Sequence, residues 1–238
     1  MPACDNPTAV GVVLAAGIGS RVGADGNKAY LTLAGRAMVS WSVAAVAAAP
    51  GIARTILVFR RGERTQARQL MDAELPGVPI EFVEGGESRH GSEHNVLRYL
   101  AADIEAATVD VVLIHDAARP LARPALMAAA VEAARSHGGA LPVLDAGTVA
   151  RTDDAGRLTP IHRSLVRVQT PQAFRAGPLL AAYRAAADAG FEGTDTSSCV
   201  ERFTDLPVHA IAGSAQNFKV TFAHDVAVAE RLLSRRYT

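Results

Sequence analysis

The chain has 238 residues, of which 49% are hydrophobic and 20% are charged. A chain of this length and composition buries a sizeable core and is not an intrinsically disordered protein. Its 24 basic residues are balanced by 24 acidic ones, so we expect neither a general nucleic-acid-binding surface nor a membrane-binding one. The sequence shows no signal peptide and no long apolar span, which favours a cytoplasmic protein.

Strand-like and helix-like segments alternate along the chain. Apolar runs predict strands over 9–14, 54–60, 78–83, 109–115 and 140–144. Helical spacing of apolar residues predicts helices over 37–49, 63–73, 90–101, 123–137, 176–189 and 222–235. Strands separated by helices of this length favour an α/β fold with right-handed crossovers: a mostly parallel, twisted sheet flanked by helices, as in Rossmann-like proteins.

The segment 147–168 departs from this alternation. Two short runs of alternating residues flank a turn at 153–156, which predicts a β-hairpin. A single hairpin is too small to fold alone, so it would protrude from the main sheet as an arm. We therefore expect one domain over 1–238, with a β-arm over 147–168 that covers a site or pairs with another subunit.

The first predicted strand leads into a loop rich in small residues, 15–22, which contains Gly17 and Gly19. Two glycines let the main chain come close to a ligand. Arg21 and Lys28 place positive charge beside the same turn. Backbone N–H groups together with two cations suit the phosphates of a nucleoside triphosphate.

A dinucleotide-binding loop is the competing interpretation of these glycines. That fingerprint needs a third glycine, but Val22 occupies its position. It also needs an acidic residue after the second strand, where this chain has Arg60 and Arg61. The sequence thus disfavours an NAD site of the dehydrogenase type.

Polar groups also follow the later strands. Ligands of open parallel sheets bind beyond the carboxyl ends of the strands, so residues at these ends should converge on one rim. The segments concerned are 85–89 with Ser92, 115–120, 169–172 and 218–221. They bring groups suited to phosphates, hydroxyls and a nucleobase.

In their order along the chain, these motifs resemble the 2-C-methyl-D-erythritol 4-phosphate cytidylyltransferase family. The loop 14–21 followed by Lys28 is shared by many nucleotidyltransferases. The resemblance is narrowed to the erythritol and pentitol phosphate enzymes by His115-Asp116-Ala117-Ala118-Arg119-Pro120, Gln169-Thr170-Pro171-Gln172 and Phe218-Lys219-Val220-Thr221. The matches run from residue 10 to about residue 230.

This resemblance implies a CTP-dependent enzyme of non-mevalonate isoprenoid precursor synthesis. It would transfer CMP from CTP to 2-C-methyl-D-erythritol 4-phosphate and release pyrophosphate. It also implies Mg²⁺, held mainly by the phosphates of CTP. Within the family the arm reaches into a second subunit, which implies a homodimer formed through the β-arm.

The resemblance also implies roles for individual residues. Arg21 and Lys28 match the catalytic basic pair. The positions matched to nucleotide binding are Ala15, Ala16, Gly17, Gly19, Gly86, Glu87, Ser92, Asp116 and Lys219. The positions matched to substrate binding are Asp116, Arg119, Thr148, Arg163 and Thr170, with Thr148 and Arg163 on the arm.

No position is matched to a metal ligand. His90 and His94 share a helix face at i, i+4 spacing, but no third ligand accompanies them. Ser88 is expected to cap the helix that follows it.

Several positions depart from the family pattern. Asn27 stands where proline usually precedes the catalytic lysine, and Thr196 stands where an acidic residue usually follows Thr-Asp. The spacing from Arg163 to Thr170 is one residue short, which leaves Arg167 as an alternative phosphate-binding residue of the arm.

Most of these departures lie on the acceptor side of the site. Ribitol 5-phosphate therefore stays open as the alternative acceptor. A catalytically silent nucleotide-binding paralogue and a dimer-forming scaffold are the alternatives from other classes of protein. The intact cation pair argues against the first, and the many phosphate-suited groups argue against the second.

Overall fold

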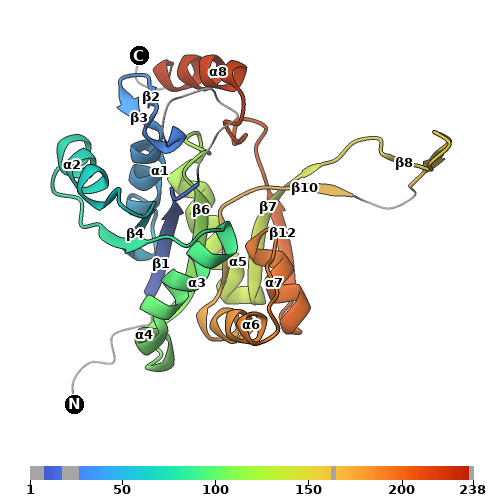
Figure 1. Cartoon of the computed structure of the whole chain (residues 1–238), viewed down its shortest axis with the longest axis horizontal. Helices are drawn as coiled ribbons and strands as arrows, with labels where there is room; N and C mark the ends of the chain where they lie inside the picture. The colour runs from blue at the N-terminus through green and yellow to red at the C-terminus, as the bar shows by residue number, and fades with distance from the viewer. Residues whose placement is uncertain (1–7, 18–26, 162–164, 236–238) are drawn as a thin grey trace.

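The computed structural model describes residues 8–17, 27–161 and 165–235. At its centre lies an eight-stranded sheet (Figure 1). Neighbouring strands on one side of this sheet run parallel, in the order β5 (Glu81–Glu84), β4 (Ile52–Phe59), β1 (Thr8–Leu14) and β6 (Val109–Asp116). Because β1 and β4–β6 are parallel, their carboxyl ends meet at one edge of the sheet.

The remaining strands extend the sheet beyond β6. The strand β11 (Gln172–Arg175) lies antiparallel between β6 and β7 (Gly139–Asp145). The strand β12 (Val208–Ala212) runs parallel to β7, and β10 (Val166–Val168) runs antiparallel to it.

Helices cover both faces of the sheet. One face packs against α1 (Met38–Ala47), α2 (Arg64–Glu74) and α5 (Pro124–His137). The other face packs against α3 (Arg89–Tyr99), α4 (Ala101–Glu105), α6 (Ala176–Asp188) and α7 (Thr196–Phe203). The last helix, α8 (Ala223–Ser234), packs on a small hairpin made of β2 (Thr32–Leu33) and β3 (Arg36–Ala37), which follows the 3-10 turn η2 (Lys28–Tyr30).

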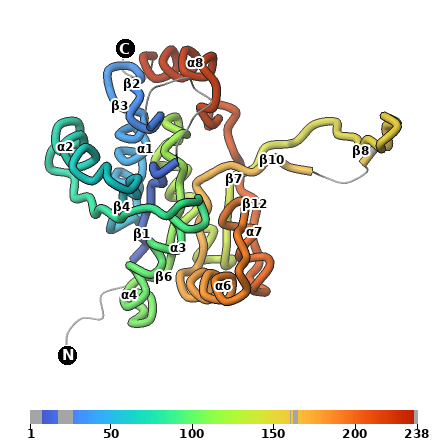
Figure 2. The backbone as a smooth tube through the Cα atoms, in the orientation of Figure 1, coloured from blue at the N-terminus to red at the C-terminus, as the bar shows by residue number. Residues whose placement is uncertain are grey.

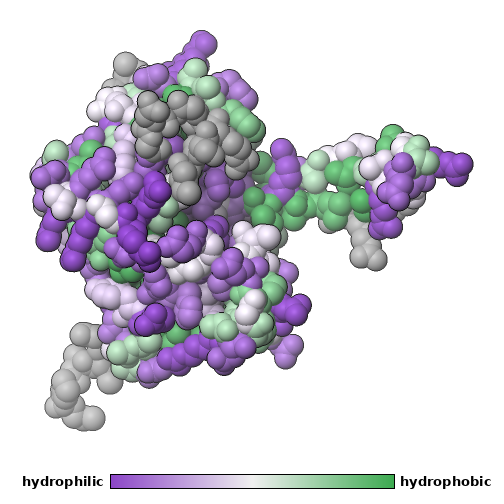
Figure 3. Space-filling model, in the orientation of Figure 1, coloured by the Kyte–Doolittle hydropathy of each residue, from purple (hydrophilic) through white to green (hydrophobic). Residues whose placement is uncertain are grey.

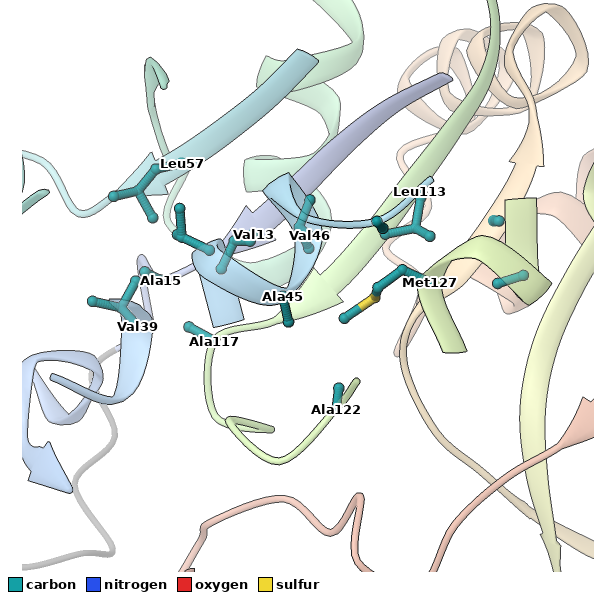
Figure 4. Packing of buried hydrophobic residues seen from close by; sticks show 14 of the residues in the cluster. Val13, Ala15, Val39, Ala45, Val46, Leu57, Leu113, Ala117, Ala122 and Met127 are labelled. Atoms are coloured by element: carbon teal, nitrogen blue, oxygen red, sulfur yellow. The ribbon is translucent and has the colours of Figure 1, made fainter. Parts of the chain in front are cut away.

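The central strands are buried on both faces, which explains their nearly continuous apolar sequences. On the face of α1 and α5, Val13, Leu57 and Leu113 from three adjacent strands pack with Val46 and Met127 (Figure 4). None of the helices within 8–17, 27–161 and 165–235 has the length and apolar character needed to cross a bilayer.

The expected α/β fold with a mostly parallel sheet is confirmed, and the five predicted strands are all present within a few residues. The strand predicted over 78–83 begins only at Glu81, because Pro79 has no N–H with which to join the ladder. The helix predicted over 90–101 is divided, with α3 ending at Tyr99 and α4 beginning at Ala101. The sequence analysis missed α7, β11, β12 and the β2–β3 hairpin.

The hairpin predicted within 147–168 is present and projects away from the body of the molecule (Figures 1 and 2). It consists of β8 (Ala150–Thr152) paired with β9 (Leu158–Pro160). At its turn the Asp153 carboxylate accepts hydrogen bonds from two backbone N–H groups, and Gly156 has a φ of +77°. The end of the predicted range differs, since β10 pairs with β7 in the main sheet. The single-domain organisation over 1–238 stays a prediction.

Gly11 allows β1 to approach α1 closely. A Cβ atom at this position would lie 2.3 Å from Cγ1 of Val46 and 3.2 Å from two carbons of Ile52. Valine in a helix has little rotational freedom about χ1, so Val46 has no other place for this methyl group.

We predict that Gly11→Ala lowers the free energy of unfolding by about 1–3 kcal/mol, because an added methyl overfills a packed core. Urea denaturation followed by circular dichroism measures this change. Gly177→Ala is the matched control, since nothing lies within 4 Å of its added Cβ in the first turn of α6. Equal stability of the two variants would contradict the prediction.

Candidate active site

A cleft of about 340 Å³ lies where β1 and β6 end, beside the segment that follows β5. Most of the predicted nucleotide-binding and catalytic positions line it: Ala15, Ala16, Gly17, Lys28, Gly86, Glu87, Ser92, Asp116 and Lys219. Further lining residues are Leu14, Asn27, Ala29, Ser88, Arg89, Ala117 and Ala118. Gly19, Arg21 and Arg163 lie outside the described residues.

Backbone hydrogen bonds hold the loops of the cleft against the sheet. Beyond the strand ends, Ala15 N–H donates to Val58 O and Ala117 N–H donates to Leu14 O. Gly85 N–H donates to Phe59 O, and a Cβ on Gly85 would lie 2.4 Å from Cβ of Ala16. The two loops therefore touch only because residue 85 is glycine.

Asn27 bonds to the start of the glycine loop, at Ala15. Its Nδ2 donates to Ala15 O and to Oε2 of Glu63, both at 2.8 Å, and its Oδ1 accepts from Ala29 N–H at 3.0 Å. These bonds place the neighbouring Lys28 at the cleft, where its Nζ donates to Val220 O at 3.1 Å. The sequence analysis noted Asn27 as a departure from the family pattern but gave it no role.

Four charged side chains form a chain of ion pairs from the cleft into the interior. Lys219 Nζ lies 2.7 Å from Oδ2 of Asp116, and Arg89 Nε lies 3.5 Å from its Oδ1. Arg89 Nη1 lies 2.6 Å from Oε1 of Glu93, a fully buried carboxyl on α3. Positive and negative groups thus alternate over Lys219, Asp116, Arg89 and Glu93.

The neighbours of Asp116 decide its protonation. Burial on its own raises the pKa of this carboxyl, but Arg89 and Lys219 outweigh burial and hold the pKa well below its usual range. Burial lowers the pKa of Arg89, and the nearby Glu93 and Asp116 carboxylates reverse this effect and raise it. Asp116 is therefore a carboxylate and Arg89 a cation at neutral pH.

The segment after β5 forms one wall of the cleft. Ser88 caps α3 as expected, since its Oγ accepts from Gly91 N–H at 3.0 Å. Ser92 Oγ accepts from Gly86 N–H at 3.1 Å and donates to Ser88 O at 2.9 Å. The Ser92 hydroxyl thus positions Gly86 and keeps one lone pair that can accept from an amino group.

Two of the predicted substrate-binding residues support the cleft from behind and do not line it. Thr170 Oγ1 accepts from Asp116 N–H at 3.1 Å and lies 3.2 Å from Nδ1 of His115. Because the carbonyl oxygen of Arg119 can only accept, Nε2–H of His115 donates to it, and in the neutral ring Nδ1 accepts from the Thr170 hydroxyl. Burial lowers the pKa of His115 to about 4, so this ring is neutral.

Arg119 braces the segment that carries Lys219. Its Nη1 donates to Asn217 O at 2.7 Å. Gln169 Nε2 donates to the same oxygen and to Ser214 O, and its Oε1 accepts from Ser214 N–H. The motif 169–172 is therefore a brace between strand ends and the 214–217 turn.

The arm residue Thr148 is exposed and lies away from the cleft of its own chain. His90, one of the two helical histidines, is committed to packing: its ring stacks on Tyr183 at 4.6 Å and its Nδ1 accepts from Gly193 N–H. Arg89 belonged to a motif that the sequence analysis singled out, but only the structure shows that it faces Asp116.

The comparisons with known proteins agree with this geometry. Residues 9–235 match the model of the family described as 2-C-methyl-D-erythritol 4-phosphate cytidylyltransferase. The chain belongs to this family. A curated protein of that name from Cereibacter sphaeroides is 39% identical over 232 residues, which cover 95% of this chain and 97% of that protein.

Solved structures of the family share the whole architecture. A 4-diphosphocytidyl-2C-methyl-D-erythritol synthase from Anaerococcus prevotii superposes with a TM-score of 0.83 at 26% identity, over 97% of this chain and 98% of that one. A 2-C-methyl-D-erythritol 4-phosphate cytidylyltransferase from Thermus thermophilus gives a TM-score of 0.71 at 32% identity, over 96% and 100% of the two chains.

We predict that Thr170→Val lowers the free energy of unfolding by about 1–3 kcal/mol, because it leaves the buried Asp116 N–H without an acceptor. It should also lower kcat/KM, since Asp116 then loses one of the bonds that orient it. Urea denaturation and steady-state kinetics measure the two effects. Thr152→Val, at an exposed position of the arm, is the control for stability, and a Thr170→Val variant as stable as this control would refute the prediction.

Proposed function

We propose that this chain transfers the CMP group of CTP to 2-C-methyl-D-erythritol 4-phosphate and releases pyrophosphate, a step of non-mevalonate isoprenoid precursor synthesis. The observation that carries the proposal is the convergence of Lys28, Lys219 and Asp116 on one cleft with the Ala15–Gly17 backbone. The family to which the chain belongs supports the same reaction. The relatives named above carry the erythritol phosphate name, which favours this acceptor over ribitol 5-phosphate.

In this reaction an oxygen of the acceptor's phosphate forms a bond to the α-phosphorus of CTP, and the bond from that phosphorus to the bridging oxygen breaks. Negative charge grows on the equatorial and leaving oxygens. Lys28 and Arg21 supply cations for this charge, and such fixed cations stabilise the transition state more than the ground state. No covalent nucleophile is needed, because the acceptor phosphate is already ionised.

The wall formed by Gly86, Glu87 and Ser92 is assigned to the cytidine. Backbone groups of this wall and the remaining lone pair of Ser92 match the polar edge of cytosine. Asp116 is assigned to hydroxyls of the ribose or acceptor, and Lys219 to the phosphates.

The same proposal includes Mg²⁺ carried mainly by the phosphates of CTP. Among the residues that the structure describes, no group of three or more histidine, cysteine or acidic side chains is arranged to hold a metal ion. Mg²⁺ commonly binds through substrate phosphates with one or two carboxylates, and Asp116 and Glu87 are the carboxylates that line the described part of the cleft. The ion would neutralise charge on the triphosphate.

We also propose that two subunits share each acceptor site through their arms. Large apolar side chains on and beside the arm are exposed (Figure 3), namely Leu158, Leu165, Val166 and Val168. Apolar surface of this kind favours burial against another protein surface. The cytoplasmic location expected from the sequence stays a prediction.

The acceptor is tested by pyrophosphate release from CTP with 2-C-methyl-D-erythritol 4-phosphate, with ribitol 5-phosphate and with neither. We expect turnover with the first. Lys28→Met should lower kcat by about a hundredfold, because the developing charge loses one fixed cation. Arg184→Met, which removes an exposed cation on α6, is the matched control and should leave kcat unchanged. Turnover with ribitol 5-phosphate alone would reject the assigned acceptor, and no turnover with either would favour a silent nucleotide binder.

The arm is tested by Arg163→Ala, which should raise the KM for the polyol phosphate far more than the KM for CTP. Arg167→Ala is the companion variant, and the larger effect identifies the phosphate-binding arginine. Mixing subunits of the more strongly affected arginine variant with Lys28→Met subunits should restore about a quarter of wild-type activity, because only one site of each mixed dimer is complete. Equal effects on both KM values, or no recovery on mixing, would argue against a shared site.

A further inference from the structure

Glu93 is a buried carboxyl beneath the cleft to which the sequence analysis gave no role. It lies on α3 one turn after Arg89, and its side chain is 1% exposed. Three donors reach its two oxygens: Arg89 Nη1 at 2.6 Å and Thr196 Oγ1 at 2.5 Å bond to Oε1, and the Tyr183 hydroxyl at 2.5 Å bonds to Oε2. Burial raises the pKa of the Glu93 carboxyl, and the Arg89 cation with the Thr196 and Tyr183 hydroxyls acts against this rise, so the charge of Glu93 depends on these three partners.

The two oxygens of Glu93 serve different parts of the molecule. Oε2 is held by Tyr183, a fully buried side chain of α6. Oε1 is turned toward Arg89, whose guanidinium lines the cleft and whose Nε faces Asp116. Oε1 thus fixes Arg89 while Oε2 ties the carboxylate to the core.

We infer that Glu93 is a positioning residue of the nucleotide site: it binds Nη1 of Arg89, so that only Nε of this guanidinium faces Asp116, and thereby fixes both charges at the cleft. The inference rests on the proposed function. Arg89 has five N–H donors on a long, flexible side chain, and without an anchoring anion it would turn toward Asp116 and compete with Lys219 for this carboxylate. With Nη1 bound to Glu93, Asp116 keeps both cations, one on each oxygen.

The neighbouring helix α7 offers a second position from which a carboxylate would reach Arg89. Thr196 stands at the position where the family pattern usually has an acidic residue. Its Oγ1 donates to Glu93 and lies 3.4 Å from Arg89 Nη1. Position 196 is therefore within reach of the same guanidinium, so a carboxylate placed there on α7 would face Arg89 as the Glu93 carboxylate on α3 does.

The test uses Glu93→Gln, Thr196→Glu and the double variant in the full-length protein. Calorimetry measures the dissociation constant for CTP, and steady-state kinetics measures KM and kcat. We expect Glu93→Gln to raise the dissociation constant for CTP about tenfold, the value of one lost charge-assisted hydrogen bond. We expect the double variant to recover most of that loss, because it returns a carboxylate to Arg89 from the other helix. Thr196→Glu alone should lower the melting temperature, since two carboxylates then share one buried guanidinium.

Tyr183→Phe provides the matched control. It removes the donor on Oε2 and leaves the Oε1 contacts to Arg89 and Thr196 in place. It should lower the melting temperature while the dissociation constant for CTP stays within about twofold of the wild-type value, a difference below the value of one hydrogen bond. If Glu93→Gln is too unstable to assay, Glu93→Asp keeps the charge, withdraws it by one methylene, and should raise the same constant by a smaller factor.

Three results would overturn the inference: wild-type affinity for CTP in Glu93→Gln, equal loss of affinity in Tyr183→Phe, or a folded double variant that binds no better than Glu93→Gln. A wild-type protein that binds CTP but turns over neither acceptor would contradict the proposed function instead. The binding constants of the variants would still decide the role of Glu93.

Discussion

The pairing of Asp116 with Arg89 and Lys219 is the interaction on which the rest of the site depends. Asp116 closes β6 at the edge where the parallel strands end, and its carboxyl group is removed from water. An unpaired charge at such a place would either be neutralised or destabilise the fold. Two cations from distant parts of the chain prevent this, so that Asp116 stays ionised and both cations stay in place.

The cation partners come from elements that only tertiary structure brings together. Arg89 begins α3, and Lys219 lies on the segment between β12 and α8. The segment that carries Lys219 is not a strand of the described sheet. Gln169 and Arg119 hold it by bonding to carbonyl groups of the 214–217 turn, and Val220 N–H donates to Ala118 O. The polar motifs by which the family is recognised thus include residues whose side chains form structural hydrogen bonds within the chain.

The sequence predicted the sheet and the nucleotide side of the cleft because both depend on local signals. Continuous apolar runs identify buried parallel strands, and the rule that ligands bind beyond the carboxyl ends of strands brings Gly17, Gly86 and Asp116 together. It did not predict β11, which is only four residues long and is placed by antiparallel pairing between β6 and β7. The same limit explains why the sequence predicted no role for Glu93 and Asn27. A polar residue looks the same in a sequence whether it faces water or accepts three buried hydrogen bonds, and only long-range contacts distinguish the two cases.

The acceptor side differs from the donor side in how it is built. Lys28, Asp116, Lys219 and the wall at Gly86 surround the cleft within one chain, held by short contacts to the sheet. Of the residues assigned to the acceptor, Thr148 is exposed on a projecting arm, whereas Thr170 Oγ1 and Arg119 Nη1 form hydrogen bonds within the protein. On this arm, Thr148 lies away from the cleft of its own chain. In the proposed dimer, a second subunit would bring its arm to this cleft, and the exposed apolar side chains of the arm and β10 would be buried on assembly. The donor site would then be determined by folding alone, whereas the acceptor site would require assembly.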